Sequence, residues 1–174
     1  TRTHLLEGKF DKLFYFFFRI NMSLFSDRIY KFVTFSQASA DLLSKRFNIR
    51  KNKFKIIKLG YDQNTYQYNP SNKNTSSKLI IGFAGKITES KRIDFLIDTI
   101  DELKIRDKIK LIIVGYNDHD EYCRSLKQLA EKINFEIEFR PFASNDELVE
   151  FYNYIDLAIY PGAISITTIE ASGC

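Results

Sequence analysis

Cysteine is scarce in this chain of 174 residues, and its two cysteines, Cys123 and Cys174, are far apart. That spacing fits neither the paired ligands of a zinc site nor the disulfide framework of a small secreted domain. The apolar run at 13–18 is far too short to cross a bilayer, and no signal-peptide cleavage site follows it. These absences favour an ordinary globular protein in a reducing compartment, which we expect to be the cytoplasm.

Familiar catalytic arrangements are missing as well. The sequence shows no Ser-His-Asp set, no zinc-ligand cluster and no paired catalytic carboxylates. The two histidines, His4 and His119, have no partner pattern, so we expect both at the surface. The glycine-containing turn at 82–91 lacks the Gly-Lys-Ser/Thr ending of a Walker loop and the third glycine of a dinucleotide fingerprint. The residues therefore offer no metal site, and no catalytic residue can be assigned.

What the chain does have is enough apolar material for a core and an uneven charge. Hydrophobic residues make up 44% of it and charged residues 28%, as in globular domains. Residues 1–58 carry 13 basic and 4 acidic side chains, whereas the remainder carries 13 basic and 18 acidic ones. This split indicates two differently charged bodies, of which the basic one suits an anionic partner or membrane surface.

Two helices and two strands are expected in the first half. The helices span 9–25 and 37–47, and the strands span 30–35 and 54–59. The apolar face of the second helix should carry Ala38, Leu42 and Leu43. The following stretch, rich in Asn, Ser and Tyr up to residue 77, has the composition of a linker.

Strands and helices alternate regularly in the second half. Short apolar runs typical of buried strands lie at 79–84, 111–114, 137–139 and 155–159. Helical patterns lie between them, at 93–103, at 121–133 and from the capping box at Ser144, and a further helix begins near Ser165. This order predicts the α/β class, with a parallel sheet and right-handed crossovers.

Several residues that could hold an anionic ligand follow these strands. The turn after the first strand contains Gly85, Lys86 and Lys91, which suit a diphosphate, although solvated surface lysines are the simpler interpretation. Gly115 ends the next strand and is interpreted as a turn residue. Glu170 is able to hydrogen-bond sugar hydroxyls, and its alternative is a solvent-facing position.

In their order along the chain, these segments resemble the retaining glycosyltransferases of family 4, the glycosyl transferases group 1, which have the two-domain GT-B architecture. The resemblance covers nearly the whole chain and rests on VTFSQASADLLSKRF at 33–47, KIIKLGYDQNTY at 55–66, GKITESK at 85–91 and IEASGC at 169–174. It implies that residues 1–61 end the N-terminal, acceptor-side domain. Residues 62–77 would then be a linker, and residues 78–174 an incomplete Rossmann-like donor domain.

The resemblance also implies a binding site for a nucleoside-diphosphate sugar, with no metal and no further cofactor. Diphosphate contacts are expected from Gly85, Lys86, Lys91, Ile164, Ser165, Ile166 and Thr167. Glu170 would bind the ribose, while Gly115 and Phe142 would lie near the base. One departure concerns the donor sugar: the family has a glutamate eight residues before Glu170, and this chain has Gly162 there.

The expected activity is transfer of a sugar, of the hexosyl type, with retention of configuration. The acceptor would be a glycan or a lipid-linked molecule in polysaccharide or glycolipid synthesis, and no nucleic acid is expected as a partner. Residues 1–58 suit peripheral contact with the inner face of a membrane. The alternatives are a non-catalytic nucleotide-sugar-binding protein and a sugar-nucleotide epimerase. The chain lacks an initial Met and ends within a helical pattern, so we expect an inactive piece of a longer enzyme.

Overall fold

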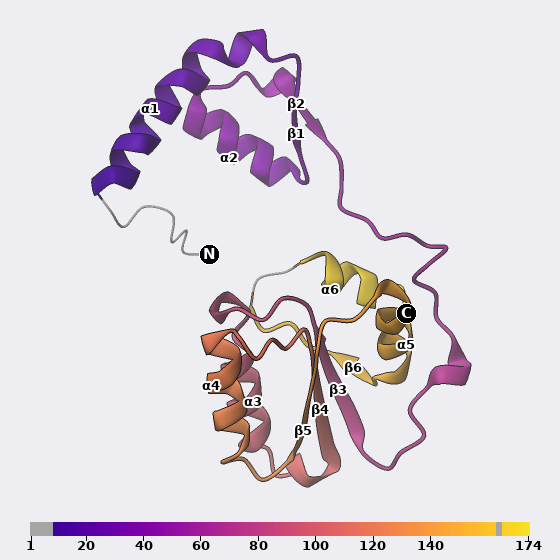
Figure 1. Ribbon diagram of the computed structural model, residues 1–174. Helices are drawn as coiled ribbons and strands as arrows, with labels where there is room; N and C mark the ends of the chain where they lie inside the picture. Colours follow the sequence, from indigo (N-terminus) through magenta and orange to yellow (C-terminus); the bar gives the residue numbers. More distant parts are fainter. Residues whose placement is uncertain (1–8, 163–164) are drawn as a thin grey trace. The chain divides into compact units, whose positions relative to one another are not determined.

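The structure, a computed structural model, describes residues 9–162 and 165–174 and divides the chain into two compact units (Figure 1). The N-terminal unit is Thr1–Leu59 and the C-terminal unit is Gly60–Cys174. The first contains a two-stranded sheet and the second a four-stranded sheet in the order β5-β4-β3-β6. All their strand pairs are parallel, so the predicted α/β class is confirmed. The assignment of an acceptor-side domain, linker and donor domain stays a prediction.

The N-terminal unit contains the two helices expected from the sequence. They are α1 (Lys9–Phe25) and α2 (Gln37–Phe47), with 3₁₀ turns at Ser26–Arg28 and Lys51–Lys53. The strands are shorter than expected, because β1 (Phe32–Thr34) and β2 (Phe54–Ile56) pair over only three residues. Ser36 caps α2 by accepting a hydrogen bond from the Ser39 amide at 3.1 Å, which fixes where the helix begins.

The buried face of α2 differs from the expected one. Ala40 and Phe47 are buried, seven residues apart on one side of the helix, whereas Leu42 is 60% exposed. The rings of Tyr15 and Phe18 from α1 lie 6.0 and 5.5 Å from the Phe47 ring. The expected apolar face was therefore wrong for Ala38 and Leu42, because α1 packs against the side of α2 that carries Phe47. Leu43 is half-buried and lies on that side, between Ala40 and Phe47.

In the C-terminal unit, helices cover both faces of the four-stranded sheet (Figure 1). The strands are β3 (Leu79–Ala84), β4 (Ile109–Val114), β5 (Glu136–Arg140) and β6 (Leu157–Ala158). Helices α3 (Ile93–Asp101) and α4 (Glu121–Ala130) lie on one face, and α5 (Asn145–Tyr154) and α6 (Ile166–Ala171) lie on the other. Short 3₁₀ turns, η3, η4 and η5, occur at Pro70–Asn72, Glu89–Lys91 and Arg106–Lys108.

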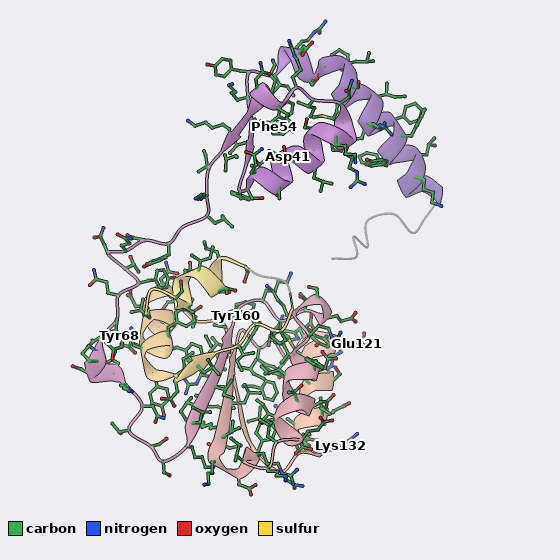
Figure 2. All side chains as sticks on the ribbon, turned by 180° about the vertical axis from the view of Figure 1, so that it is seen from behind. Asp41, Phe54, Tyr68, Glu121, Lys132 and Tyr160 are labelled. Atoms are coloured by element: carbon green, nitrogen blue, oxygen red, sulfur yellow. The ribbon has the colours of Figure 1, made fainter. Side chains whose placement is uncertain are left out.

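Two apolar clusters form the core of this unit, one on each face of the sheet. Successive residues of a strand point to opposite faces, so Ile81 and Phe83 join the cluster beneath α3 and α4, while Ile80 joins the one beneath α5. Figure 2 shows side chains filling the space between the sheet and its helices. Tyr66, 5% exposed, belongs to the second cluster, so part of the segment expected as a linker packs on the sheet.

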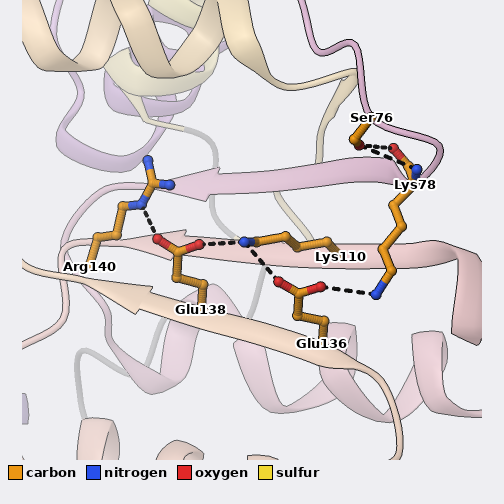
Figure 3. Close-up of polar contacts among 6 residues, drawn as sticks. All are labelled: Ser76, Lys78, Lys110, Glu136, Glu138 and Arg140. Carbon is orange, nitrogen blue, oxygen red and sulfur yellow. Dashed lines mark hydrogen bonds and ion pairs between the residues drawn. The ribbon is translucent and has the colours of Figure 1, made fainter.

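A ladder of charged residues lies across β3, β4 and β5 (Figure 3). Along it, each charged group is 2.6–2.9 Å from the next, in the order Lys78, Glu136, Lys110, Glu138, Arg140. Both carboxyl groups have lowered pKa values, chiefly because Lys110 hydrogen-bonds Glu136 and Arg140 hydrogen-bonds Glu138. Charges on an edge strand such as β5 also discourage pairing with a foreign strand.

Candidate functional site at the carboxyl edge of the sheet

The ends of β3 and β4 meet at two glycines. Gly85 has a φ of +141° and Gly115 a φ of +110°, conformations that favour glycine. The Gly85 amide donates a hydrogen bond to the Val114 carbonyl at 3.1 Å. A Cβ atom on Gly115 would lie only 2.1 Å from the Gly85 carbonyl oxygen. Both glycines are therefore required for the two strand ends to approach each other, beyond the turn role expected for Gly115.

Lys86 and Lys91 lie on the turn that follows Gly85. Lys86 is exposed, whereas Lys91 is half-buried at the end of η4. The Lys91 amide donates to the Thr88 carbonyl at 2.9 Å, which fixes the backbone of this turn. Burial lowers the pKa of the Lys91 ammonium. The two predicted diphosphate lysines thus share one turn at the carboxyl edge, where open α/β sheets bind ligands.

The start of α6 lies beside Gly85. The Thr167 hydroxyl oxygen is 3.4 Å from the place where a Gly85 Cβ would stand. Ser165 precedes the helix, and its hydroxyl is 2.7 Å from that of Thr167. The structure therefore brings the start of α6, with Ser165, Ile166 and Thr167, close to the Gly85 turn, and their role in binding phosphate stays a prediction. Ile164 lies outside the described residues.

Glu170, the predicted ribose ligand, is half-buried on α6, near enough to three tyrosines to influence their pKa values. Burial, and then the Glu170 carboxylate, raise the pKa of Tyr66. Burial also raises the pKa values of Tyr152 and Tyr160, with a smaller contribution from Glu170. The Tyr160 hydroxyl donates to the Thr167 carbonyl at 3.1 Å. Tyr152 and Tyr160 could not be assigned to this site from the sequence, because only the topology brings α5 and the segment after β6 to Glu170.

The two predicted base-region residues, Gly115 and Phe142, lie at neighbouring strand ends. The Gly115 amide donates to the carbonyls of Arg140 and Pro141 at 3.0 and 3.2 Å. Phe142 is 62% exposed and lines a groove of about 630 Å³. Val114, Arg140, Glu150, Phe151 and Tyr154 are among the other residues of this groove. An exposed ring beside a groove is suited to stacking on a flat apolar group.

Gly162 contacts the Lys91 turn. A Cβ atom at this position would be 2.1 Å from the Ser90 carbonyl oxygen and 2.7 Å from the Lys91 Cα. A glutamate side chain, which the family pattern places here, has no room against this backbone. Among the described residues, no group of three or more His, Cys, Asp or Glu is placed to hold a metal ion.

Residues 65–174 match the family described as glycosyl transferases group 1. An uncharacterized glycosyltransferase of Methanocaldococcus jannaschii is 25% identical over 154 residues, which cover 80% of this chain and 39% of that protein. This chain therefore spans well under half the length of that relative.

Solved glycosyltransferase structures share the fold. HepE of Anabaena, crystallised with UDP and glucose, superimposes with a TM-score of 0.73 at 20% identity, covering 92% of this chain and 46% of HepE. WaaG, a glycosyltransferase involved in lipopolysaccharide biosynthesis, gives a TM-score of 0.67 at 16% identity, covering 97% of this chain and 52% of WaaG. The fold is thus that of GT-B glycosyltransferases, and with more than half of its residues matching the family, the chain belongs to the glycosyl transferases group 1.

Proposed function

We propose that this protein transfers a hexosyl group from a nucleoside-diphosphate sugar to a glycan or lipid-linked acceptor, with retention of configuration as in family 4. The proposal depends on one observation: the start of α6 lies beside Gly85, the residue from which the Lys86–Lys91 turn begins. Two cations on a turn at the carboxyl edge of a parallel sheet favour a diphosphate there. Structures of HepE with UDP and with UDP-glucose support a donor of this class.

The two lysines would act on the leaving group. As the bond between sugar and diphosphate breaks, negative charge develops on the diphosphate, and a fixed cation stabilises it more than it stabilises the bound donor. Glu170 would hold the ribose hydroxyls, and the tyrosines around it would limit its movement. No metal is required for these roles, so EDTA should leave the activity unchanged.

A turnover assay tests the proposal. The full-length protein is incubated with UDP- and GDP-hexoses and with glycan or lipid-linked acceptors, and NMR reports the anomeric configuration of the product. We expect a product with the configuration of the donor, whereas the 174-residue chain should bind nucleotide without transferring sugar. An inverted product would contradict retention.

Two alternatives would give different results in the same assay. A non-catalytic nucleotide-sugar-binding protein is favoured by Gly162, and it would bind the donor without turnover. An epimerase would interconvert sugar nucleotides in the absence of any acceptor. Transfer to an acceptor excludes both alternatives.

We further propose that the N-terminal unit contacts an anionic membrane from the cytoplasmic side. Helix α1 exposes Leu13, Phe16 and Phe17, each by more than half, and carries exposed Lys12 and Arg19. Apolar rings and basic groups suit a bilayer interface, where each basic residue contributes about 1 kcal/mol. No described helix is long and apolar enough to span a membrane. Co-sedimentation with anionic vesicles but not neutral ones, weakened by salt, would support this contact, and indifference to lipid charge would contradict it.

A further inference from the structure

Gly162 and the Ser90–Lys91 backbone are packed too closely for any side chain to lie between them. A Cβ atom at 162 would be 2.1 Å from the Ser90 carbonyl oxygen, 2.7 Å from the Lys91 Cα and 2.8 Å from the Lys91 carbonyl carbon. All three atoms belong to the backbone, so no rotamer change can relieve the clash. Any substitution at 162 must therefore displace the Lys91 turn or the 160–162 segment.

The Lys91 turn is held from its other side as well. Its 3₁₀ hydrogen bonds join the Lys91 amide to Thr88 and the Arg92 amide to Glu89, at 2.9 and 3.0 Å. Arg92 has a φ of +54°, and the chain then enters α3 at Ile93, which is fully buried. Helix α3 anchors one side of the turn. Contact with Gly162 on the other side therefore fixes the position of the Lys91 Cα atom, from which its side chain extends.

We propose that Gly162 is a positioning residue, whose missing side chain lets the 160–162 segment dock on Ser90–Lys91 and so holds Lys91 in place for the donor diphosphate. This inference rests on the proposed function, and it assigns a new role to the position where the family has a sugar-contacting glutamate. A carboxylate introduced there, as in Gly162→Glu, should weaken donor binding rather than strengthen it. The half-buried position of Lys91, whose pKa burial lowers, agrees with a lysine held by its surroundings.

A double-mutant cycle tests the inference. Calorimetry measures the binding of UDP and GDP to the 174-residue chain as wild type, Gly162→Ala, Lys91→Ala and the double variant. We expect Gly162→Ala to weaken binding about tenfold, close to the loss of one charge-assisted contact. It should have no further effect once Lys91 is absent. Gly60→Ala is the matched control, because no atom lies within 4 Å of a Cβ there.

A second variant keeps the test decisive if Gly162→Ala does not fold. Pro161→Ala adds no bulk and only loosens the segment before Gly162, so it should weaken binding by a factor of about two to five. That loss should also disappear in the Lys91→Ala background. Wild-type affinity in a folded Gly162→Ala variant, or in Pro161→Ala if the former is unfolded, would overturn the inference. The inference would also be overturned if the loss of nucleotide affinity caused by either variant persisted in full in the Lys91→Ala background.

A nucleotide-free measurement separates this inference from the proposed function. If the wild type binds neither UDP nor GDP, the double-mutant cycle gives no reading, and the position of Lys91 is then read from the pKa of its ammonium by NMR of labelled lysine, whereas the proposed function is decided by the turnover assay. Release of the turn should bring this pKa up toward that of an exposed lysine in Gly162→Ala, or in Pro161→Ala if the former is unfolded. An unchanged Lys91 pKa would show that Gly162 does not position it.

Discussion

Gly115 lies directly against Gly85, so that a Cβ on Gly115 would be 2.1 Å from the Gly85 carbonyl oxygen. Gly115→Ala should therefore destabilise the chain by about 2 kcal/mol or more, through overpacking against a backbone atom and an unfavourable φ. Urea unfolding measures this loss. Gly60→Ala, placed where no atom lies within 4 Å, should stay within about 0.5 kcal/mol of wild type. Equal stabilities of the two variants would contradict the close approach.

The charged ladder makes stability depend on pH. The pKa values of Glu136 and Glu138 are lowered in the fold, so their contribution is present above about pH 4.3 and is lost as the pH falls through the folded values. Hydrogen bonds to Glu136 and Glu138 raise the pKa of Lys110, so its contribution is present below about pH 10.4 and is lost above the folded value. The ladder therefore stabilises the fold between these limits.

Lys110→Met tests this dependence, because it removes the charge and keeps most of the stem. The ladder is partly exposed, so we expect a loss of about 1 kcal/mol at pH 7 in urea unfolding. The loss should shrink at low pH, once the pH has fallen below the lowered pKa values of both glutamates. Lys108→Met, at an exposed position on η5, is the matched control and should be nearly neutral. A Lys110→Met loss of the same size at both pH values would show that the charge does not matter.

Tyr66 reports the position of Glu170. Burial, and then the Glu170 carboxylate, raise the pKa of Tyr66, so Glu170→Gln should lower it toward the ordinary tyrosine value. NMR titration of labelled tyrosines measures the change. Tyr122 serves as an internal control, because burial and a 2.8 Å hydrogen bond to Asp94 raise its pKa to about 12, independently of Glu170. If the pKa of Tyr66 stays unchanged, Glu170 does not face it.

The two lysines of the β3 turn should each contribute to nucleotide affinity. Loss of one charge-assisted contact costs about 1.5–3 kcal/mol, so Lys86→Ala and Lys91→Ala should each weaken UDP or GDP binding roughly ten- to hundredfold. Lys132→Ala is the matched control, because Lys132 lies beyond the far end of α4 (Figure 2). Calorimetry that gives unchanged affinity for both turn variants would remove the lysines from the site.

Periodicity and capping predicted most of the fold. β3 and the start of α5 match the sequence interpretation, because a continuous apolar run and the Ser144 capping box are local patterns. Strand β6 is only Leu157–Ala158, shorter than its apolar run, since a strand's length depends on how far its neighbour pairs with it. On α2 the prediction was wrong for Ala38 and Leu42, because the packing of α1 decides which side is buried, and the sequence of α2 alone does not contain that information.

The sequence predicts those residues of the candidate site that directly follow strands. It does not predict those whose place depends on the packing of distant segments. Gly85, Lys86 and Lys91 stand directly after an apolar run, so their place at the carboxyl edge could be expected from the sequence. The tyrosines around Glu170 come from three separate segments, which only the topology brings together. The role of Gly162 depends on distances to Ser90 and Lys91, which residue spacing does not reveal.

The central claim is that a nucleoside diphosphate binds at the carboxyl edge of the β5-β4-β3-β6 sheet. Amide NMR of the 174-residue chain, titrated with UDP, GDP and ADP, tests it most directly. For at least one nucleotide, we predict that the amides of residues 85–91 and 165–170 shift on binding while those around Lys132 stay in place. Shifts confined to the N-terminal unit or to the amino edge of the sheet, or no shift with any of the three nucleotides, would contradict the claim.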